Sequence, residues 1–453
     1  MPFEVHAVTK GPSHHFFGFH DLVQWNAKGD LMLALEVDDI SHPPMAGEKA
    51  RSGIIIPDEQ EFVPIRETCA FNYPQGSRQQ WLGDTDLFLC NDRVGDRWGL
   101  HIVDARDLKV IDTLPFPVYC HDPNTGDVYY INFSRLQLAG GYGYVGIPDP
   151  FAGEDIPCRC GIYKGNIRSG KYELFVSLCD IATVGEQKPK ETGYPHYVTH
   201  LVLNPSKTRL AFLHRYWVGD GGIMTRLMTV GVDGSQLRLL AKGPLSHFDW
   251  LDDKTLMIWG RQELLLSKFR EWRLFSAPVI RQAAKAAKKF VQLWRRSRSA
   301  MGKTQCRGCF LRITDSEVPT ISPVGIGILT EDGHPMVCPA DRRWIVIDTY
   351  PDPKGIRTLM LYNHVENRRI DIGSFKMLDA RPDRRSLDLD QACEGVLKSI
   401  LKDLPLDNYL FTRSGYHCDL HPRWRADGSE VAFDSIHEGT RQVYTVKVEL
   451  ESV

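Results

Sequence analysis

The stretch GYHCDLHPRW at residues 415–424 shows the pattern that recurs along the chain and decides the fold. His421 stands at the entry to an apolar strand, Asp427 and Gly428 supply a tight turn, and a second strand ends at Asp434. An Asp-Gly pair between two apolar runs is a strong signal for a β-hairpin. The unit is therefore a histidine, a strand, a polar turn, a second strand and a charged residue.

Weaker copies of this unit occur along the whole chain. They begin at His20, Gln80, His121, His200, His247, His334 and His421. Units of two to four short strands cannot bury their own faces, so about seven of them should close radially. We predict an all-β protein, a seven-bladed β-propeller with helical insertions, formed as one domain over residues 1–453. Residues 14–17 precede the first unit and are expected to close the ring or to line its mouth.

The starting residues of the units should ring one mouth of the central channel, because the first strand of each blade lines that channel. Six of these seven residues are histidines, a pattern that favours a functional site. The alternative is that the histidines only hydrogen-bond between blades.

Three segments interrupt the repeats. Residues 277–304 combine an apolar stripe at helical spacing with many Lys and Arg residues, which predicts a basic helical insertion. This helix either packs on the flank of the propeller, makes a peripheral contact with an anionic membrane, or extends a polyanion-binding rim. Residues 384–404 are expected to form a second helical insertion. Residues 133–160 are rich in Gly and aromatic residues and are expected to form a long functional loop over the channel mouth.

The composition is that of a soluble globular protein. Of the 453 residues, 42% are hydrophobic and 25% are charged, and the formal net charge of −2 gives no bias toward nucleic acid. The N-terminus lacks the pattern of a signal peptide, and no apolar run approaches the roughly 20 residues that span a membrane. The eleven cysteines are scattered, and the pairs in CRC at 158–160 and CRGC at 306–309 have no second pair at zinc-finger spacing. A cytoplasmic, mostly reduced protein is expected.

Several motifs resemble those of the seven-bladed propeller polysaccharide lyases. They are LHRYW at 213–217, SHFDW at 246–250, DGHP at 332–335, DTYPD at 348–352 and CDLHPRW at 418–424. The chain is most similar to the ulvan lyases and more distantly to the oligogalacturonate lyases, over most of its length apart from the two helical insertions. The resemblance implies cleavage of a uronate-containing glycan by β-elimination. It also implies a metal at the channel mouth, a structural zinc as in ulvan lyases or a catalytic manganese as in oligogalacturonate lyases.

The resemblance leaves a second hypothesis open. Kinship of the fold with TolB-like binding propellers is compatible with a non-catalytic propeller that binds glycan or protein, for example in polysaccharide assembly. The second catalytic histidine of the ulvan lyases has no counterpart, because Asn132 and Ser134 stand near its place. A glycoside hydrolase is the least favoured class, because the blade starts carry no obvious pairs of carboxylates.

The candidate catalytic residues follow from the chemistry of β-elimination. The C5 proton of a uronate can be removed only if the neighbouring carboxylate is neutralised, and by resemblance Arg215 occupies the position of the neutralising arginine. A blade-surface salt bridge is the alternative role for this arginine. His200 is the first candidate for the base and His121 the second, and Tyr142 or Tyr144 could return the proton.

The candidate substrate-binding residues are His20, Tyr142, Tyr216 and Trp217, the last two as a wall for stacking sugar rings. The predicted metal ligands are Cys418, His421, His334 and His247, with Asp348 as an alternative to His247. A thiolate with imidazoles suits zinc, while manganese remains possible. The alternative is a buried free cysteine beside hydrogen-bonded histidines. The expected partner is an acidic poly- or oligosaccharide.

Overall fold

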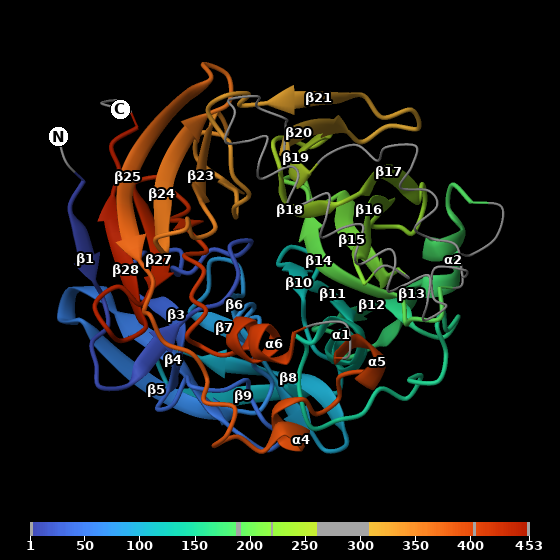
Figure 1. The fold of residues 1–453 in the computed structure, drawn as a ribbon, viewed down its shortest axis with the longest axis horizontal. Helices are drawn as coiled ribbons and strands as arrows, with labels where there is room; N and C mark the ends of the chain where they lie inside the picture. Colours follow the sequence, from blue (N-terminus) through green and yellow to red (C-terminus); the bar gives the residue numbers. More distant parts are fainter. Residues whose placement is uncertain (1–2, 187–191, 219–220, 261–307, 402–404, 451–453) are drawn as a thin grey trace.

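Seven four-stranded antiparallel sheets stand around a central channel (Figure 1). The computed structural model describes residues 3–186, 192–218, 221–260, 308–401 and 405–450. Within these residues, the first strands of neighbouring blades contact one another, as β10 (Cys120–Asp122) does with β14 (Tyr197–Leu203). The prediction of a seven-bladed β-propeller is confirmed.

The strands of each blade pair in chain order from the channel to the rim. Blades one to three contain β2 (His14–Phe16), β3 (Met32–Val37), β4 (Ala50–Ile56), β5 (Glu61–Thr68), β6 (Gln80–Trp81), β7 (Leu87–Val94), β8 (Arg97–Asp104), β9 (Lys109–Leu114), β10, β11 (Asp127–Ile131), β12 (Gly161–Asn166) and β13 (Tyr172–Ser177). Blades four to six contain β14, β15 (Arg209–Trp217), β16 (Ile223–Gly231), β17 (Arg238–Gly243), β18 (Leu245–Trp250), β19 (Thr255–Gly260), β20 (Cys309–Thr314), β21 (Ile321–Val324), β22 (Met336–Val337), β23 (Trp344–Asp348), β24 (Ile356–Asn363) and β25 (Arg368–Lys376).

The seventh blade is built from both ends of the chain. It contains β26 (Arg423–Trp424), β27 (Glu430–Ser435) and β28 (Gln442–Lys447), and β1 (Val5–Ala7) adds the outer strand by pairing with β28. The expectation that residues 14–17 close the ring is therefore wrong in detail. Residues 14–16 form β2, the inner strand of blade one, and residues 5–7 make the closure.

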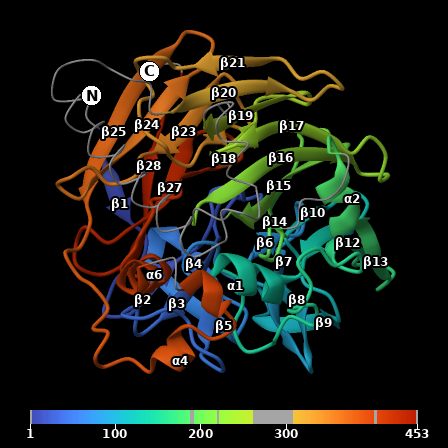
Figure 2. The same ribbon diagram turned by 45° about the vertical axis from the view of Figure 1, so that its right-hand side comes forward.

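The segment that was expected to be a long loop begins with a helix, α1 (Phe133–Gly140). The side chain of Asn132 caps this helix by accepting the N–H of Arg135, and Gly141 ends it in the left-handed conformation at φ 70°. All eight residues of α1 are buried. The helix contacts β14 of blade four and lies beside the later helices α5 and α6, as two views show (Figures 1 and 2).

A second insertion lies between β25 and β26 and contains three short helices, α4 (Leu389–Ala392), α5 (Lys398–Leu401) and α6 (Leu406–Arg413). It crosses the face of the propeller and packs on α1, where the N–H of Leu397 donates to the Leu138 carbonyl. Trp217, at the end of β15, belongs to the same apolar cluster as these helices. The chain that follows α6 therefore runs to the channel mouth. The predicted basic helix at 277–304 lies outside the described residues.

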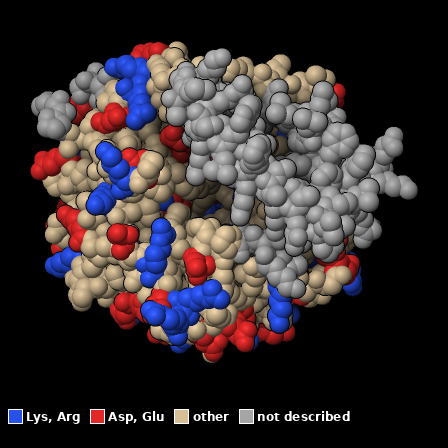
Figure 3. All heavy atoms as spheres, in the orientation of Figure 1, with Lys and Arg blue, Asp and Glu red and all other residues tan. Residues whose placement is uncertain are grey.

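The covalent and surface features complete the description. Cys158 and Cys179 form a disulfide that ties the chain after α1 to α2 (Leu178–Thr183), although the cysteines were expected to be mostly reduced and Cys158 was expected to have no role. On the described part of the face in Figure 3, acidic and basic side chains alternate without a patch of one sign. Among the described helices, none is long and apolar enough to cross a membrane.

Candidate active site

Five of the predicted blade-start histidines lie together at the channel, around the ring of Phe19. The distances between ring centroids are 4.3 Å for His20, 4.8 Å for His200, 5.0 Å for His421, and 6.0 Å for both His247 and His334. The structure thus brings together residues from the first, fourth, fifth, sixth and seventh repeats.

Two of these histidines sit on unusual backbone. His200 has a φ of 58° at a bulge in β14, where the register shifts between Thr199 and Val202, and His421 has a φ of 41° just before β26. The left-handed conformation costs a residue with a Cβ about 1–3 kcal/mol and is concentrated at functional sites. A bulge also re-aims a side chain that would otherwise follow the alternation of the strand. The backbone is therefore shaped to direct these two rings.

Burial keeps most of the cluster uncharged. Desolvation and the charge of Arg215 hold the pKa of His200 well below its usual value, and desolvation and the neighbouring His334 do the same for His421 and His20. These imidazoles are neutral at neutral pH. A neutral imidazole has a free lone pair, so it can accept a proton or bind a metal.

Two histidines of the cluster and Asp419 bring their donor atoms close together. Ligand atoms of His334, Asp419 and His421 all lie within 4.8 Å of one another, and all three residues are buried. The Nδ1 of His334 lies 2.8 Å from a carboxylate oxygen of Asp348, and the Nδ1 of His421 lies 2.7 Å from the Gly18 carbonyl. Each Nδ1 therefore carries the proton, which leaves Nε2 of both rings as an acceptor. This is the usual arrangement of histidines that bind a metal.

The carboxylate of this group is ionised. Asp419 pairs with Arg357 at 2.6 Å and with His417 at 3.3 Å. Burial alone would raise the pKa of Asp419, but these two partners outweigh it and hold the pKa well below its usual value. Burial alone would lower the pKa of His334, but Asp348 outweighs it and raises this pKa, so a metal would compete with a proton at Nε2. Two imidazoles and a carboxylate are a donor set that suits a divalent transition metal, manganese or zinc. The residues present therefore fit the metal that the resemblance implies.

The thiol that was predicted as a ligand lies outside this group. Cys418 is buried among Phe16, Leu35 and Tyr73, and burial raises the pKa of its thiol to about 11. The reason is the alternation of an extended chain, because positions 419 and 421 face the channel while 418 faces the core. The donor from this segment is Asp419. Of the other predicted ligands, the His247 ring lies 4.0 Å from the His334 ring, tilted by 45°, without joining the group, and Asp348 accepts a hydrogen bond from Nδ1 of His334.

Arg215 lies beside the histidine cluster, together with Tyr142, which follows the end of α1. Its Nη1 donates to the Tyr142 hydroxyl at 3.3 Å, and its buried Nε has no hydrogen-bond partner among the described residues. The guanidinium of Arg413, from α6, lies 5.2 Å from the centre of the Tyr142 ring. The Tyr350 ring lies 5.5 Å from the ring of His334, and burial raises the pKa of its hydroxyl well above the usual value, so it stays protonated. Two cations and two phenols therefore converge beside the donor group.

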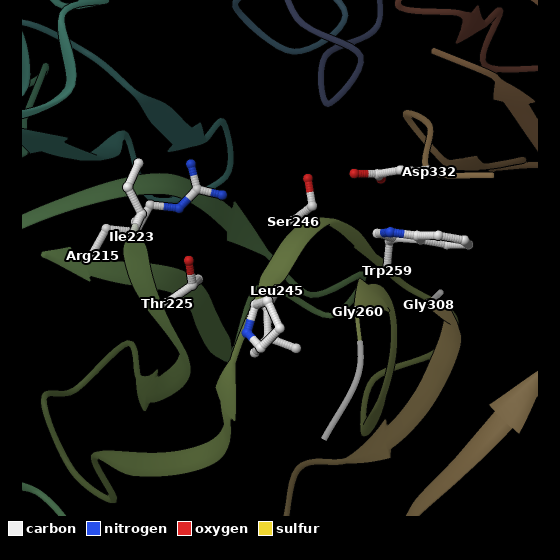
Figure 4. Close-up of a pocket in the computed structure, with 10 residues that line it drawn as sticks. Arg215, Ile223, Thr225, Leu245, Ser246, Trp259, Gly260, Gly308 and Asp332 are labelled. Carbon is white, nitrogen blue, oxygen red and sulfur yellow. The ribbon is translucent and has the colours of Figure 1, made fainter. Parts of the chain in front are cut away.

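A cavity of about 420 Å³ opens next to Arg215 between blades four and five (Figure 4). Arg215, Ser246 and Asp332 project toward one another at one end of it, and Trp259 lines its side. A carboxylate oxygen of Asp332 lies 3.4 Å from Nδ1 of His247. Because the His247 ring also contacts the His334 ring, the cavity and the candidate metal donors belong to one continuous site.

Tyr144 is not at the mouth. Its ring is fully buried and stacks on Phe133 at 4.2 Å, and its hydroxyl accepts a hydrogen bond of 3.0 Å from the Asn91 amide. It packs in the core between blades two and three and cannot meet a substrate there. Tyr142, two residues earlier, is the tyrosine of this segment that reaches the site.

Tyr216 and Trp217 do not form an exposed wall. Tyr216 is buried and stacks on His196 at 4.3 Å, and Trp217 is buried with its indole N–H donating to the Ala139 carbonyl at 2.7 Å. Trp217 holds blade four against α1, and Tyr216 packs on His196. Both side chains are buried, so neither offers the exposed stacking surface that was expected.

His121 lies apart from the other histidines. Its Nδ1 is 2.7 Å from the Gln80 side-chain oxygen, and burial and the charge of Lys207 lower its pKa to about 4. Lys207 is in the turn after β14, whereas Arg215 pairs with Tyr197 at the start of β14. His121 is therefore at the opposite end of the channel from Arg215 and is not a second base for the same site.

The sequence analysis missed five residues of the site, Asp332, Tyr350, Arg357, Arg413 and Asp419. Asp332, Tyr350 and Asp419 stand inside motifs that it singled out, so alternation along an extended chain was the signal that could have found them. Arg357 starts the outer half of blade six, and Arg413 comes from the inserted helix α6. Nothing in their local sequence marks these two arginines.

Comparison with known proteins supports the fold. No family model and no curated protein sequence matches the chain. Among solved structures, it is similar to an oligogalacturonate lyase in complex with manganese, with a TM-score of 0.58 and 12% identity over 99% of this chain and 94% of that one. An oligogalacturonate lyase from Vibrio parahaemolyticus gives a TM-score of 0.55 and 13% identity over the same shares of the two chains. Fold and site together define a seven-bladed propeller with a histidine–carboxylate donor group and an arginine–tyrosine cluster at one mouth.

Proposed function

We propose that the protein is a lyase that cleaves a uronate-containing oligosaccharide by β-elimination. The observation that carries the proposal is the convergence of Arg215, two tyrosine hydroxyls and a histidine–carboxylate donor group at one mouth of the channel. Elimination needs a cation for the substrate carboxylate, a neutral base and a protonated acid, and these are the groups present. The likeness to oligogalacturonate lyases in fold is compatible with this class of reaction.

Each residue has a role in the reaction. Arg215 binds the carboxylate with its planar fork and stabilises the charge that develops on it. Neutral His200 takes the proton from C5, the C4–O4 bond breaks as the C4–C5 double bond forms, and the hydroxyl of Tyr350 gives its proton to O4 of the leaving sugar. Tyr142 orients Arg215 through its hydrogen bond. The raised pKa of Tyr350 and the lowered pKa of His200 give both groups the required protonation state.

We further propose that His334, Asp419 and His421 hold a divalent metal ion. When bound, it would supply positive charge that lowers the cost of forming the C5 anion. Asp348 and Gly18 orient the two imidazoles, and Arg357 orients the carboxylate. Without a thiolate, this set no longer favours zinc over manganese as strongly as the sequence indicated.

The test is formation of an unsaturated product from a panel of pectate, ulvan and alginate oligosaccharides, followed by ultraviolet absorbance. Arg215→Lys should lose most activity because a lysine cannot form the bidentate contact. His200→Ala should lose about 10²–10⁴-fold in kcat and retain substrate binding. Arg209→Lys, at the other end of β15, is the matched control and should behave as wild type.

The rival hypothesis of a non-catalytic binding propeller is decided by the same panel. If no oligosaccharide yields an unsaturated product with the wild-type protein, the lyase proposal is wrong. If such oligosaccharides still bind, with an affinity that depends on Arg215, the protein is a glycan-binding propeller.

A further inference from the structure

We propose that the cavity between blades four and five binds the sugar ring next to the reacting uronate, and that Trp259 is its stacking platform. The substrate class is then an oligosaccharide whose second ring extends toward blade five. The inference rests on the proposed function, because Arg215 forms the boundary between the cavity and the donor group. Apart from Arg215, it adds a binding subsite at residues that the catalytic roles do not use.

The position of Trp259 suits this role. It lies in β19, is partly exposed and lines the cavity. Phe310 meets its indole edge-on, with the centroids 5.1 Å apart and the planes at 72°. A Cβ at Gly308 would come within 2.9 Å of the indole, so only glycine allows the chain to pass so close. Phe310 and the backbone at Gly308 therefore fix the orientation of the indole. A fixed ring is what a stacking surface for the apolar face of a pyranose requires.

The opposite end of the cavity is polar. Arg215, Ser246 and Asp332 offer a cation, a hydroxyl and a carboxylate within one small region (Figure 4). A carboxylate is a good acceptor for two adjacent sugar hydroxyls, while it repels a second uronate carboxylate. The ring in the cavity should therefore turn its hydroxyl edge toward Asp332. An apolar wall with a few convergent polar groups, in a volume of about 420 Å³, is typical of a small-molecule site.

The wall of the cavity also connects this ring to the chemistry. Asp332 contacts Nδ1 of His247, and the His247 ring lies 4.0 Å from the ring of His334 in the donor group. A second ring that occupies the cavity would therefore position the reacting uronate between Arg215 and the donor group. The affinity should therefore increase from monosaccharide to disaccharide, because a single ring cannot occupy both the cavity and the position between Arg215 and the donor group.

The experiment measures binding of galacturonate, glucuronate and their disaccharides by calorimetry, and KM for turnover of the matching trisaccharides. Trp259→Ala should weaken disaccharide binding and raise KM about tenfold, while monosaccharide binding changes less than twofold. Trp259→Phe should recover most of the loss. Ile223→Trp, which fills the cavity from the other wall, should reproduce the effect without touching Trp259. Tyr172→Ala, an exposed aromatic on β13 and far from the cavity, is the control.

The outcomes separate the two proposals. If wild type cleaves or binds the disaccharides and neither Trp259→Ala nor Ile223→Trp changes the preference for disaccharide over monosaccharide, the subsite is wrong and the function stands. If wild type neither cleaves nor binds any of these sugars, the proposed function falls and the subsite falls with it.

Discussion

Asp348 hydrogen-bonds to both segments that carry the candidate metal donors. The Asp348→Asn variant therefore tests how these donors are positioned, while all three of them stay in the chain. Its fully buried carboxylate accepts the backbone N–H and Nδ1–H of His334, at 2.7 and 2.8 Å. It also accepts the N–H groups of Leu420 and His421, at 3.1 and 3.3 Å. An asparagine of the same shape can accept with only one of its two end atoms. The variant should therefore leave the donors in place but release one of the two segments.

The magnitude follows from the lost contacts. A buried N–H that loses its acceptor costs about 1–3 kcal/mol, and two of them face the amide nitrogen, so we expect a loss of about 2–6 kcal/mol in the free energy of unfolding. Unfolding entropy is about 2.1 cal/mol/K per residue, so for 453 residues this lowers Tm by only about 2–6 °C. Removal of such a supporting group typically lowers metal affinity about 10–100-fold. At saturating metal, the metal-induced stabilisation should therefore shrink by about 1.4–2.7 kcal/mol.

The assay is thermal denaturation of chelator-treated protein with and without added Mn²⁺ or Zn²⁺. The control is Asp149→Asn, a buried carboxylate that pairs with Arg135 at 3.0 Å, away from the donors. It should lose comparable stability in the absence of metal and keep the full metal-induced shift. An undiminished shift in Asp348→Asn would refute the positioning role. No shift in the wild type with either metal would refute the metal site itself.

Three further outcomes follow from the described packing. Because burial raises the pKa of Cys418 to about 11, almost no thiolate exists at pH 8, and the native protein should resist alkylation at this residue. The Cys418→Ala variant should keep its bound metal, and loss of the metal would show that the thiol is a ligand after all. Trp217→Ala should cost about 3–5 kcal/mol in stability, measured by urea titration, because it removes a buried anchor; a drop in sugar affinity at unchanged stability would contradict this. Reduction of the bond between Cys158 and Cys179, separated by 21 residues, should cost about 3 kcal/mol, and an unchanged Tm after reduction would show that the link contributes nothing.

The architecture could be predicted because it repeats. A polar turn between two apolar runs is a local signal, and seven such signals in series leave few folds that bury every sheet. The ring closure could not be read in this way. Residues 5–7 carry only one short apolar run, and their partner lies at 444–446, so nothing local marks the pairing. The helix at 133–140 was missed because its capping residue, Asn132, also suits a turn.

Only part of the site could be predicted, because local patterns mark some of its residues and the tertiary arrangement alone places the others. His334 and His421 were found because blade-start histidines face the same site in five of the seven repeats. Cys418 was chosen over Asp419 on chemical preference, although alternation in an extended chain puts Asp419 on the same side as His421. Arg413 could not be found at all, because its place depends on how an inserted helix crosses the propeller.

The pairing of β1 with β28 has a consequence for how the chain is made. Val5 must wait for Val446, its partner, until about 441 further residues have been synthesised. At about 5–20 residues per second, that delay is about 20–90 s, during which the ring stays open. Asp419 and His421 lie less than 30 residues before Val446, so the donor group is completed only shortly before the ring can close. A nascent chain therefore has neither a closed ring nor the candidate metal donors until this segment has been made.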